Sequence, residues 1–146
     1  MDTQNQLAEE HRSQQIKYRY YLIALAVACI GYSVHSTVDY TLSRVSILLG
    51  VSVIAWGVSV YCGLTFLKYS MSILYANFSL FNIRDGKDPM VGSNPEMIEI
   101  GIDAVKDAIE ENQKASGGYS KWQEYLLVIG AISFLLWHTL ELYNKV

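Results

Sequence analysis

The stretch VSILLGVSVIAWGVSVYCGLTFL, residues 45–67, decides the fold class, because its 23 residues include no charged side chain. A helix needs about 20 mostly apolar residues to cross about 30 Å of hydrocarbon. Inside a bilayer every backbone polar group needs a partner within the protein, and a helix supplies one for each. The stretch therefore predicts a transmembrane helix.

Two other segments have the same character. Residues 18–38 and residues 122–143 are long and mostly apolar. Aromatic side chains gather near the ends of both segments, as is typical of residues at a membrane interface: Tyr18, Tyr20, Tyr21, Trp122 and Tyr125 toward one side, Trp137 and Tyr143 toward the other. The sequence thus predicts an all-α integral membrane protein with three transmembrane helices.

The composition excludes several classes of protein. Only 17% of the 146 residues are charged and the formal net charge is −3, so the chain has no basic tract for a nucleic-acid backbone. Cys29 and Cys62 both fall in apolar runs, which argues against a disulfide framework or a zinc knuckle. Phosphate-binding, dinucleotide-binding and zinc-protease motifs are absent. We therefore expect no enzyme and no nucleic-acid partner.

The distribution of Lys and Arg predicts the orientation. With three spans, the polar N-terminal tail (residues 1–17) and the segment 68–121 share one side of the membrane. Nine of the eleven Lys and Arg residues lie in these two segments or, in the case of Arg19, at the adjoining end of the first span. Only Arg44 and Lys145 lie on the other side. Because cytoplasmic segments carry the excess of positive charge, we expect a multi-pass protein of the plasma (inner) membrane. Its N-terminus would be cytoplasmic and its C-terminus outside.

Residues 68–121 predict a cytoplasmic helical hairpin between spans two and three. Residues 69–83 carry no charge, so the second helix is expected to continue to about residue 83. Asn94 and Pro95 suit the N-cap and first position of a new helix. Ser116-Gly117-Gly118 predicts its end, and Ser120 with Gln123 predicts a capping box that opens the third span.

The new helix has one apolar and one acidic face. Ile98, Ile102, Val105 and Ile109 share the apolar face. The opposite face carries mostly carboxylates: Glu96, Glu99, Asp103, Asp107 and Glu110. A helix lying on a membrane surface would present Lys and Arg there instead. We therefore expect the apolar face to pack on protein, most simply on residues 69–83.

Small residues on one face of the second span predict close helix packing. Ser46, Gly50 and Gly57 lie near one face, and small side chains let membrane helices approach closely. The partner is either another span of the same chain or a second subunit.

Four polar residues form a candidate metal site. His35 and Asp39 stand four apart near the end of span one, and His138 and Glu141 stand three apart near the end of span three. Parallel spans would bring the two pairs to similar depth, and ionisable groups in membranes usually pair or face water. Imidazoles and carboxylates suit a transition metal, and two facing histidines suit haem. A water-exposed polar rim, a hydrogen-bond network and a proton relay remain alternatives.

These features together favour a non-enzymatic membrane protein that acts by protein–protein contacts. It would be an accessory subunit of a membrane complex or a homo-oligomer in the lipid bilayer, without a cofactor. Two alternatives remain open. One is a homo-oligomeric pore or effector with a polar lining from Ser46, Ser52, Ser59 and Thr65. The other is a redox subunit that binds a metal or haem through the four residues above.

Overall fold

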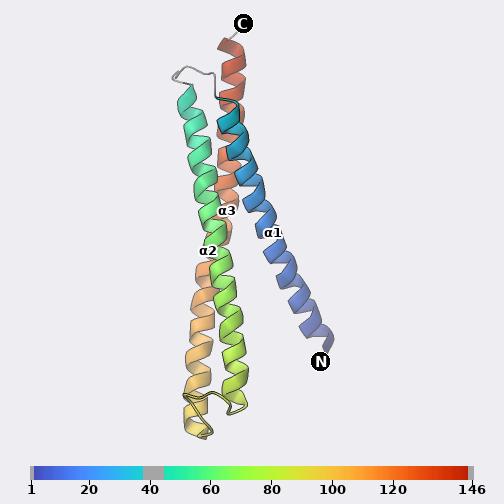
Figure 1. Cartoon of the computed structure of the whole chain (residues 1–146), viewed down its shortest axis with the longest axis vertical. Coiled ribbons are helices and arrows are strands. Elements are labelled where there is room, and N and C mark those ends of the chain that lie inside the picture. Colours follow the sequence, from blue (N-terminus) through green and yellow to red (C-terminus); the bar gives the residue numbers. More distant parts are fainter. Residues whose placement is uncertain (1, 38–44, 145–146) are drawn as a thin grey trace. The chain divides into compact units, whose positions relative to one another are not determined.

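The computed structural model describes residues 2–37 and 45–144, which form three helices and, within those ranges, no strand. They are α1 (Asp2–His35), α2 (Ser46–Arg84) and α3 (Pro95–Asn144), drawn in blue, green and orange to red in Figure 1. The polar residues 2–17 are helical and belong to α1. α2 continues through residues 69–83 to Arg84.

Two of the three helices, α2 and α3, are long and apolar enough to cross a membrane. Only 33% and 11% of their most apolar windows are buried inside the protein, whereas the core helix of a soluble protein would be mostly buried. A third span over residues 18–38 is not confirmed. From residue 18 to His35, the apolar run of α1 is interrupted by Arg19, four tyrosines, one glycine and one serine. Residue 38 lies outside the described residues.

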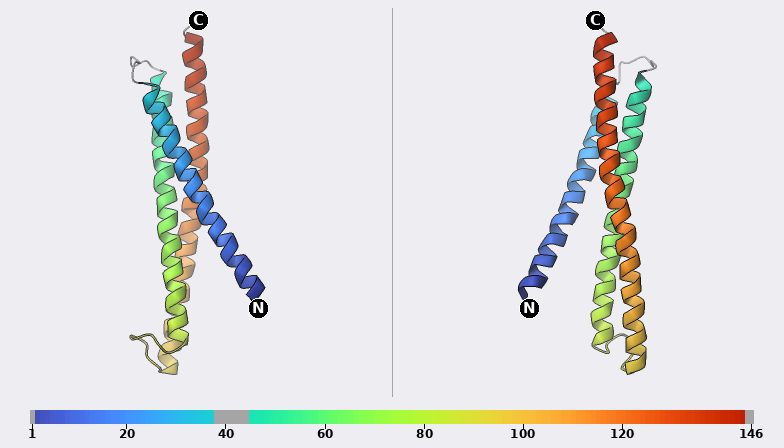
Figure 2. Two further views of the ribbon diagram at one scale, coloured as in Figure 1. Left: turned by 45° about the vertical axis from the view of Figure 1, so that its right-hand side comes forward. Right: turned by 180° about the vertical axis from the view of Figure 1, so that it is seen from behind.

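The chain divides into two compact units. Unit 1 contains α1, the beginning of α2 up to Leu64 and the end of α3 from Ser120. Within it, α1 and α3 run in the same direction and α2 runs in the opposite one (Figures 1 and 2). The most buried apolar side chains of unit 1 are Ala26, Leu49, Ala55, Trp56, Cys62 and Trp137.

Unit 2, residues 65–119, is an antiparallel hairpin made by the end of α2 and the beginning of α3. The rings of Tyr69 and Tyr119 stack with centroids 5.8 Å apart. Asn112 Nδ2 donates to Ser72 Oγ at 3.3 Å. The apolar face of α3 is half-buried in this hairpin, and Ile73 and Ile83 of α2 are buried.

The connection between α2 and α3 is built by local turn chemistry. Gly86 and Gly92 have φ angles of +65° and +64°, a conformation that side chains with a Cβ rarely adopt. Asp88 Oδ1 accepts a hydrogen bond from the backbone N–H of Met90 at 2.9 Å. Asn94 Oδ1 accepts from the backbone N–H of Glu96 at 3.1 Å, so Asn94 is the N-cap of α3 as the sequence indicated.

The predicted helix end at Ser116-Gly117-Gly118 is wrong, because α3 is one helix of 50 residues that runs through this site. A glycine C-cap needs a positive φ, and neither Gly117 nor Gly118 has one. Each glycine weakens the helix by about 1 kcal/mol relative to alanine. Packing on either side of the pair offsets this, since Ser116 and Gln123 are both buried. Ser120 and Gln123 are consequently not a capping box.

Candidate functional site

Gln123 of α3 lies where the three helices of unit 1 meet, and its side chain is fully buried. Its backbone carbonyl oxygen accepts a 2.7 Å hydrogen bond from Ser59 Oγ of α2. Its side-chain oxygen lies 3.4 Å from Nη1 of Arg19 in α1. Its amide nitrogen Nε2 has no hydrogen-bond partner among the residues that the structure describes and faces Gly63 of α2. One residue thus contacts both other helices of unit 1, α1 through its side-chain oxygen and α2 through its backbone carbonyl.

Arg19 connects α1 to the same turn of α3. Its guanidinium donates to the carbonyl oxygen of Ser120 at 3.2 Å and also to Ser120 Oγ. Nη1 lies 2.8 Å from a carboxylate oxygen of Glu124. The arginine side chain is 10% exposed and the glutamate side chain 46% exposed. Because a charge-assisted bond of this length is stronger than a neutral one, this cluster is a strong polar attachment of α1 to α3.

Trp56 of α2 makes the second tie between α2 and α3. It is 3% exposed, and its indole N–H donates to the carbonyl oxygen of Leu127 at 3.2 Å. Gly130 leaves room for the indole, since a Cβ at that position would lie 2.5 Å from Nε1. The tryptophan therefore buries its large ring while its one polar atom remains satisfied.

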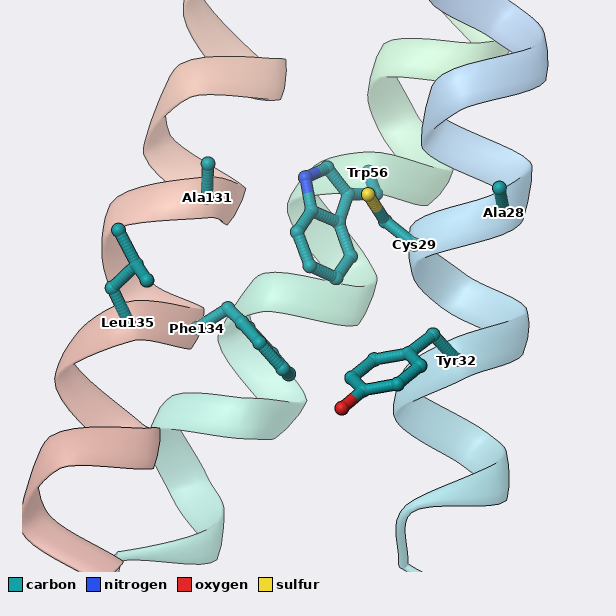
Figure 3. A pocket seen from close by; sticks show the side chains of 7 residues that line it. All are labelled: Ala28, Cys29, Tyr32, Trp56, Ala131, Phe134 and Leu135. Atoms are coloured by element: carbon teal, nitrogen blue, oxygen red, sulfur yellow. The ribbon is translucent and has the colours of Figure 1, made fainter.

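An apolar groove of about 380 Å³ lies beside Trp56 and is lined by all three helices of unit 1. Figure 3 shows the indole between Cys29 of α1 and Phe134 of α3, with the ring of Tyr32 next to Phe134. The Tyr32 and Phe134 rings meet edge to face at 6.0 Å. None of the seven lining side chains carries a carboxylate, an imidazole or an amine. The groove thus suits apolar atoms and offers the thiol of Cys29 no general base.

The structure brings His35 and His138 to similar levels of unit 1 but gives them different surroundings. Tyr32 and Phe134, which are in contact, lie one turn before them in α1 and α3. Both histidines are exposed, and the imidazole of His138 stacks on Phe134 with an interplanar angle of 3°. Glu141 is half-buried in α3, and Asp39 lies outside the described residues.

The candidate metal site therefore remains a prediction. Within residues 2–37 and 45–144, no three His, Cys, Asp or Glu side chains lie close enough to hold a metal ion. The complete set of His35, Asp39, His138 and Glu141 includes one residue that this search did not cover.

The predicted packing face of α2 is open in unit 1. Gly50 and Gly57 are exposed, and a Cβ added to either would meet no atom within 4 Å. Ser46, the first residue of α2, is half-buried. The other described helices of unit 1 therefore do not pack on these two glycines. The small residues of α2 that do permit close packing inside the unit are Gly63 and the buried serines.

Two of the three serines proposed to line a pore lie inside the protein. Ser52 and Ser59 are both fully buried. Ser52 Oγ donates to the carbonyl oxygen of Leu48, and Ser59 Oγ donates to Gln123 as described above. Neither hydroxyl lies on the open face of α2, so this arrangement does not favour the pore.

Sequence reasoning missed the cluster around Gln123. It used Arg19 only to predict orientation, and Ser120 and Gln123 only as a helix cap. One signal was available: an arginine and a glutamate stand at corresponding ends of two predicted spans, and ionisable residues there usually pair with one another. The pairing itself joins positions more than 100 residues apart. Comparison with protein-family models, with curated proteins and with solved structures gives no match.

Proposed function

We propose that this protein is a small multi-pass protein of the inner membrane that acts by protein–protein contacts and self-associates through the open face of α2. Two helices of sufficient length and apolarity support a membrane location. The asymmetry of Lys and Arg supports a cytoplasmic N-terminus and an external C-terminus. In this proposal α1 is the third span.

The observation that carries the proposal is the environment of Gly50 and Gly57. They stand seven residues apart, which places them on one side of the helix. Large apolar side chains at the same interval form ridges beside them: Ile47 is 68% exposed, Ile54 68% and Tyr61 63%. Alternating ridges and glycine gaps suit the approach of another helix, because membrane helices associate mainly by close packing.

Self-association is tested by adding bulk at Gly57. We expect Gly57→Leu to lower the mass of the purified protein in detergent, measured by light scattering, because a leucine would hold two helices apart. Gly31→Leu is the matched control: Gly31 of α1 is also exposed and has no atom within 4 Å of an added Cβ. A wild-type protein that is monomeric at all concentrations, or a Gly57→Leu variant of unchanged mass, would contradict the proposal.

The topology is tested by reporter fusions that are active only outside the cytoplasm. A reporter fused after Val146 should be active, and one inserted in the turn between Gly86 and Gly92 should be inactive. Activity at the turn would contradict this topology: without activity after Val146, it would fit either a reversed three-span chain or a chain in which only α2 and α3 span and both ends are cytoplasmic. Activity at neither position would leave both the turn and the C-terminus in the cytoplasm, so α3 would not be a span.

A further inference from the structure

The end of α2 in unit 2 carries an exposed apolar stripe, which comes later in the helix than the face that carries Gly50 and Gly57 (the glycine face). Its members are all more than 60% exposed: Met71, Leu74, Tyr75, Phe78 and Phe81. The positions 71, 74, 78 and 81 follow the alternating three- and four-residue spacing of a coiled-coil seam, with Tyr75 beside it. Residues 69–83 of α2 contain no charge.

The hairpin of unit 2 leaves this stripe uncovered. α2 packs on α3 with another side, on which Ile73 is 7% exposed and Ile83 3% exposed. The contacts of Ser72 with Asn112 and of Tyr69 with Tyr119 also join the two helices. α3 therefore occupies one side of α2, and the exposed side chains of the stripe lie on another.

The charge of unit 2 argues against a lipid surface as the partner. Glu96, Glu99, Asp103, Asp107 and Glu110 are exposed along α3, and the Lys106 ammonium lies 3.4 Å from the Asp103 carboxylate. Helices that lie on membranes present Lys and Arg to anionic headgroups. A unit with this many exposed carboxylates would be repelled by such a surface.

We propose that the stripe binds the same stripe of a second copy of this chain, forming a parallel two-helix seam. The seam is self-complementary, as a twofold contact requires. The three largely exposed aromatic rings, with a Met and a Leu, could bury on the order of 600 Å² of accessible surface per copy. This area is close to the roughly 800 Å² that each partner buries in a standard interface. Without charges along residues 69–83 of α2, two copies meet no like-charge repulsion there.

The parallel direction follows from the proposed membrane location, on which this inference rests. Two copies inserted with the same orientation have their α2 helices pointing the same way. In a parallel seam each residue lies near its own counterpart along the whole length. In an antiparallel seam only residues at the crossing point would do so.

The test is thiol crosslinking in native membranes, with Cys29 and Cys62 first replaced by alanine. Leu74→Cys and Phe78→Cys should each give a covalent dimer with a short bis-maleimide, as should Met71→Cys and Phe81→Cys at the two ends. Glu110→Cys, exposed on the acidic side of α3, is the control and should give none. Dimers from only one seam position would overturn the parallel arrangement. Products containing only a different protein would overturn the second copy as partner.

A second measurement separates this inference from the proposed function. Phe78→Glu should weaken self-association by about tenfold or more, since truncating or charging a central aromatic contact typically has this effect. One result would overturn the seam and leave the glycine face supported. In that case Gly57→Leu lowers the mass in detergent, Phe78→Glu does not, and the seam cysteines give no dimer. If the seam cysteines crosslink while Gly57→Leu has no effect, the seam stands and the glycine face fails.

Discussion

Gly63 of α2 lies so close to Gln123 of α3 that a Cβ on the glycine would be 2.5 Å from Nε2 of the glutamine. The same Cβ would lie 2.7 Å from Cγ1 of Ile23 in α1. Gln123 is fully buried and Ile23 is half-buried, so an added Cβ would have to displace side chains that are already packed. The absence of a side chain at position 63 is what allows the three helices to converge on Gln123.

The first prediction is that Gly63→Ala destabilises the protein. Alanine favours a helix by about 1 kcal/mol over glycine, yet overpacking of this kind typically destabilises by about 1–3 kcal/mol. We expect the second effect to dominate in an unfolding titration followed by circular dichroism in detergent. Gly117→Ala, at an exposed position with no atom within 4 Å of the added Cβ, should be stabilising instead. Equal effects of the two variants would contradict the packing at Gln123.

The second prediction concerns the attachment of α1 by Arg19. Arg19→Met keeps an apolar stem but removes every donor, leaving the buried side-chain oxygen of Gln123 without its arginine partner. We expect a loss of about 1–3 kcal/mol of stability, and a smaller loss for Glu124→Gln because that carboxylate is 46% exposed. The double variant should lose less than the sum of the two. Lys17→Met, on an exposed part of α1, should be nearly neutral, and a loss equal to that of Arg19→Met would refute the specific role of Arg19.

The third prediction tests the contact between Trp56 and Gly130. A Cβ at position 130 would lie 2.5 Å from Nε1 and 2.6 Å from Cδ1 of the indole, so Gly130→Ala should destabilise by about 1–3 kcal/mol. In a Trp56→Leu background the obstacle is gone, and the same substitution should be neutral or stabilising. The coupling is measured by a double-mutant cycle of unfolding free energies. If the effects of Gly130→Ala and Trp56→Leu were additive, the destabilisation by Gly130→Ala would not come from contact with the indole of Trp56.

The fourth prediction concerns the apolar face of α3 in unit 2. Ile102 is half-buried, whereas its neighbour Asp103 is exposed. Ile102→Asp places a charge where it must be desolvated, with an expected loss of about 2 kcal/mol or more. Limited proteolysis between Lys87 and Lys121 should become faster in this variant, and Asp103→Asn should leave the rate unchanged. Similar rates for the two variants would show that this face does not hold the hairpin together.

The local features of this protein could be predicted from sequence because they depend on neighbouring residues. The uncharged stretches of α2 determine a long apolar helix, and Asn94 before Pro95 determines where α3 begins. The glycine-containing turn between the two helices is equally local. The end predicted at Gly117-Gly118 was wrong because glycine lowers helix stability without fixing the backbone, and packing on both sides of the pair decided the outcome.

The candidate site could not be predicted, because its parts are far apart along the chain. The pairing of Arg19 with Ser120 joins residues 101 positions apart, and the pairing of Ser59 with Gln123 joins residues 64 apart. The sequence pattern indicated Gly50 and Gly57 as packing positions and did not include Gly63. Only the tertiary structure distinguishes them, since it packs Gly63 against Gln123 and leaves Gly50 and Gly57 open. Helix formation is set by hydrogen bonds within a few residues, but the face that a helix buries is set by the helices beside it.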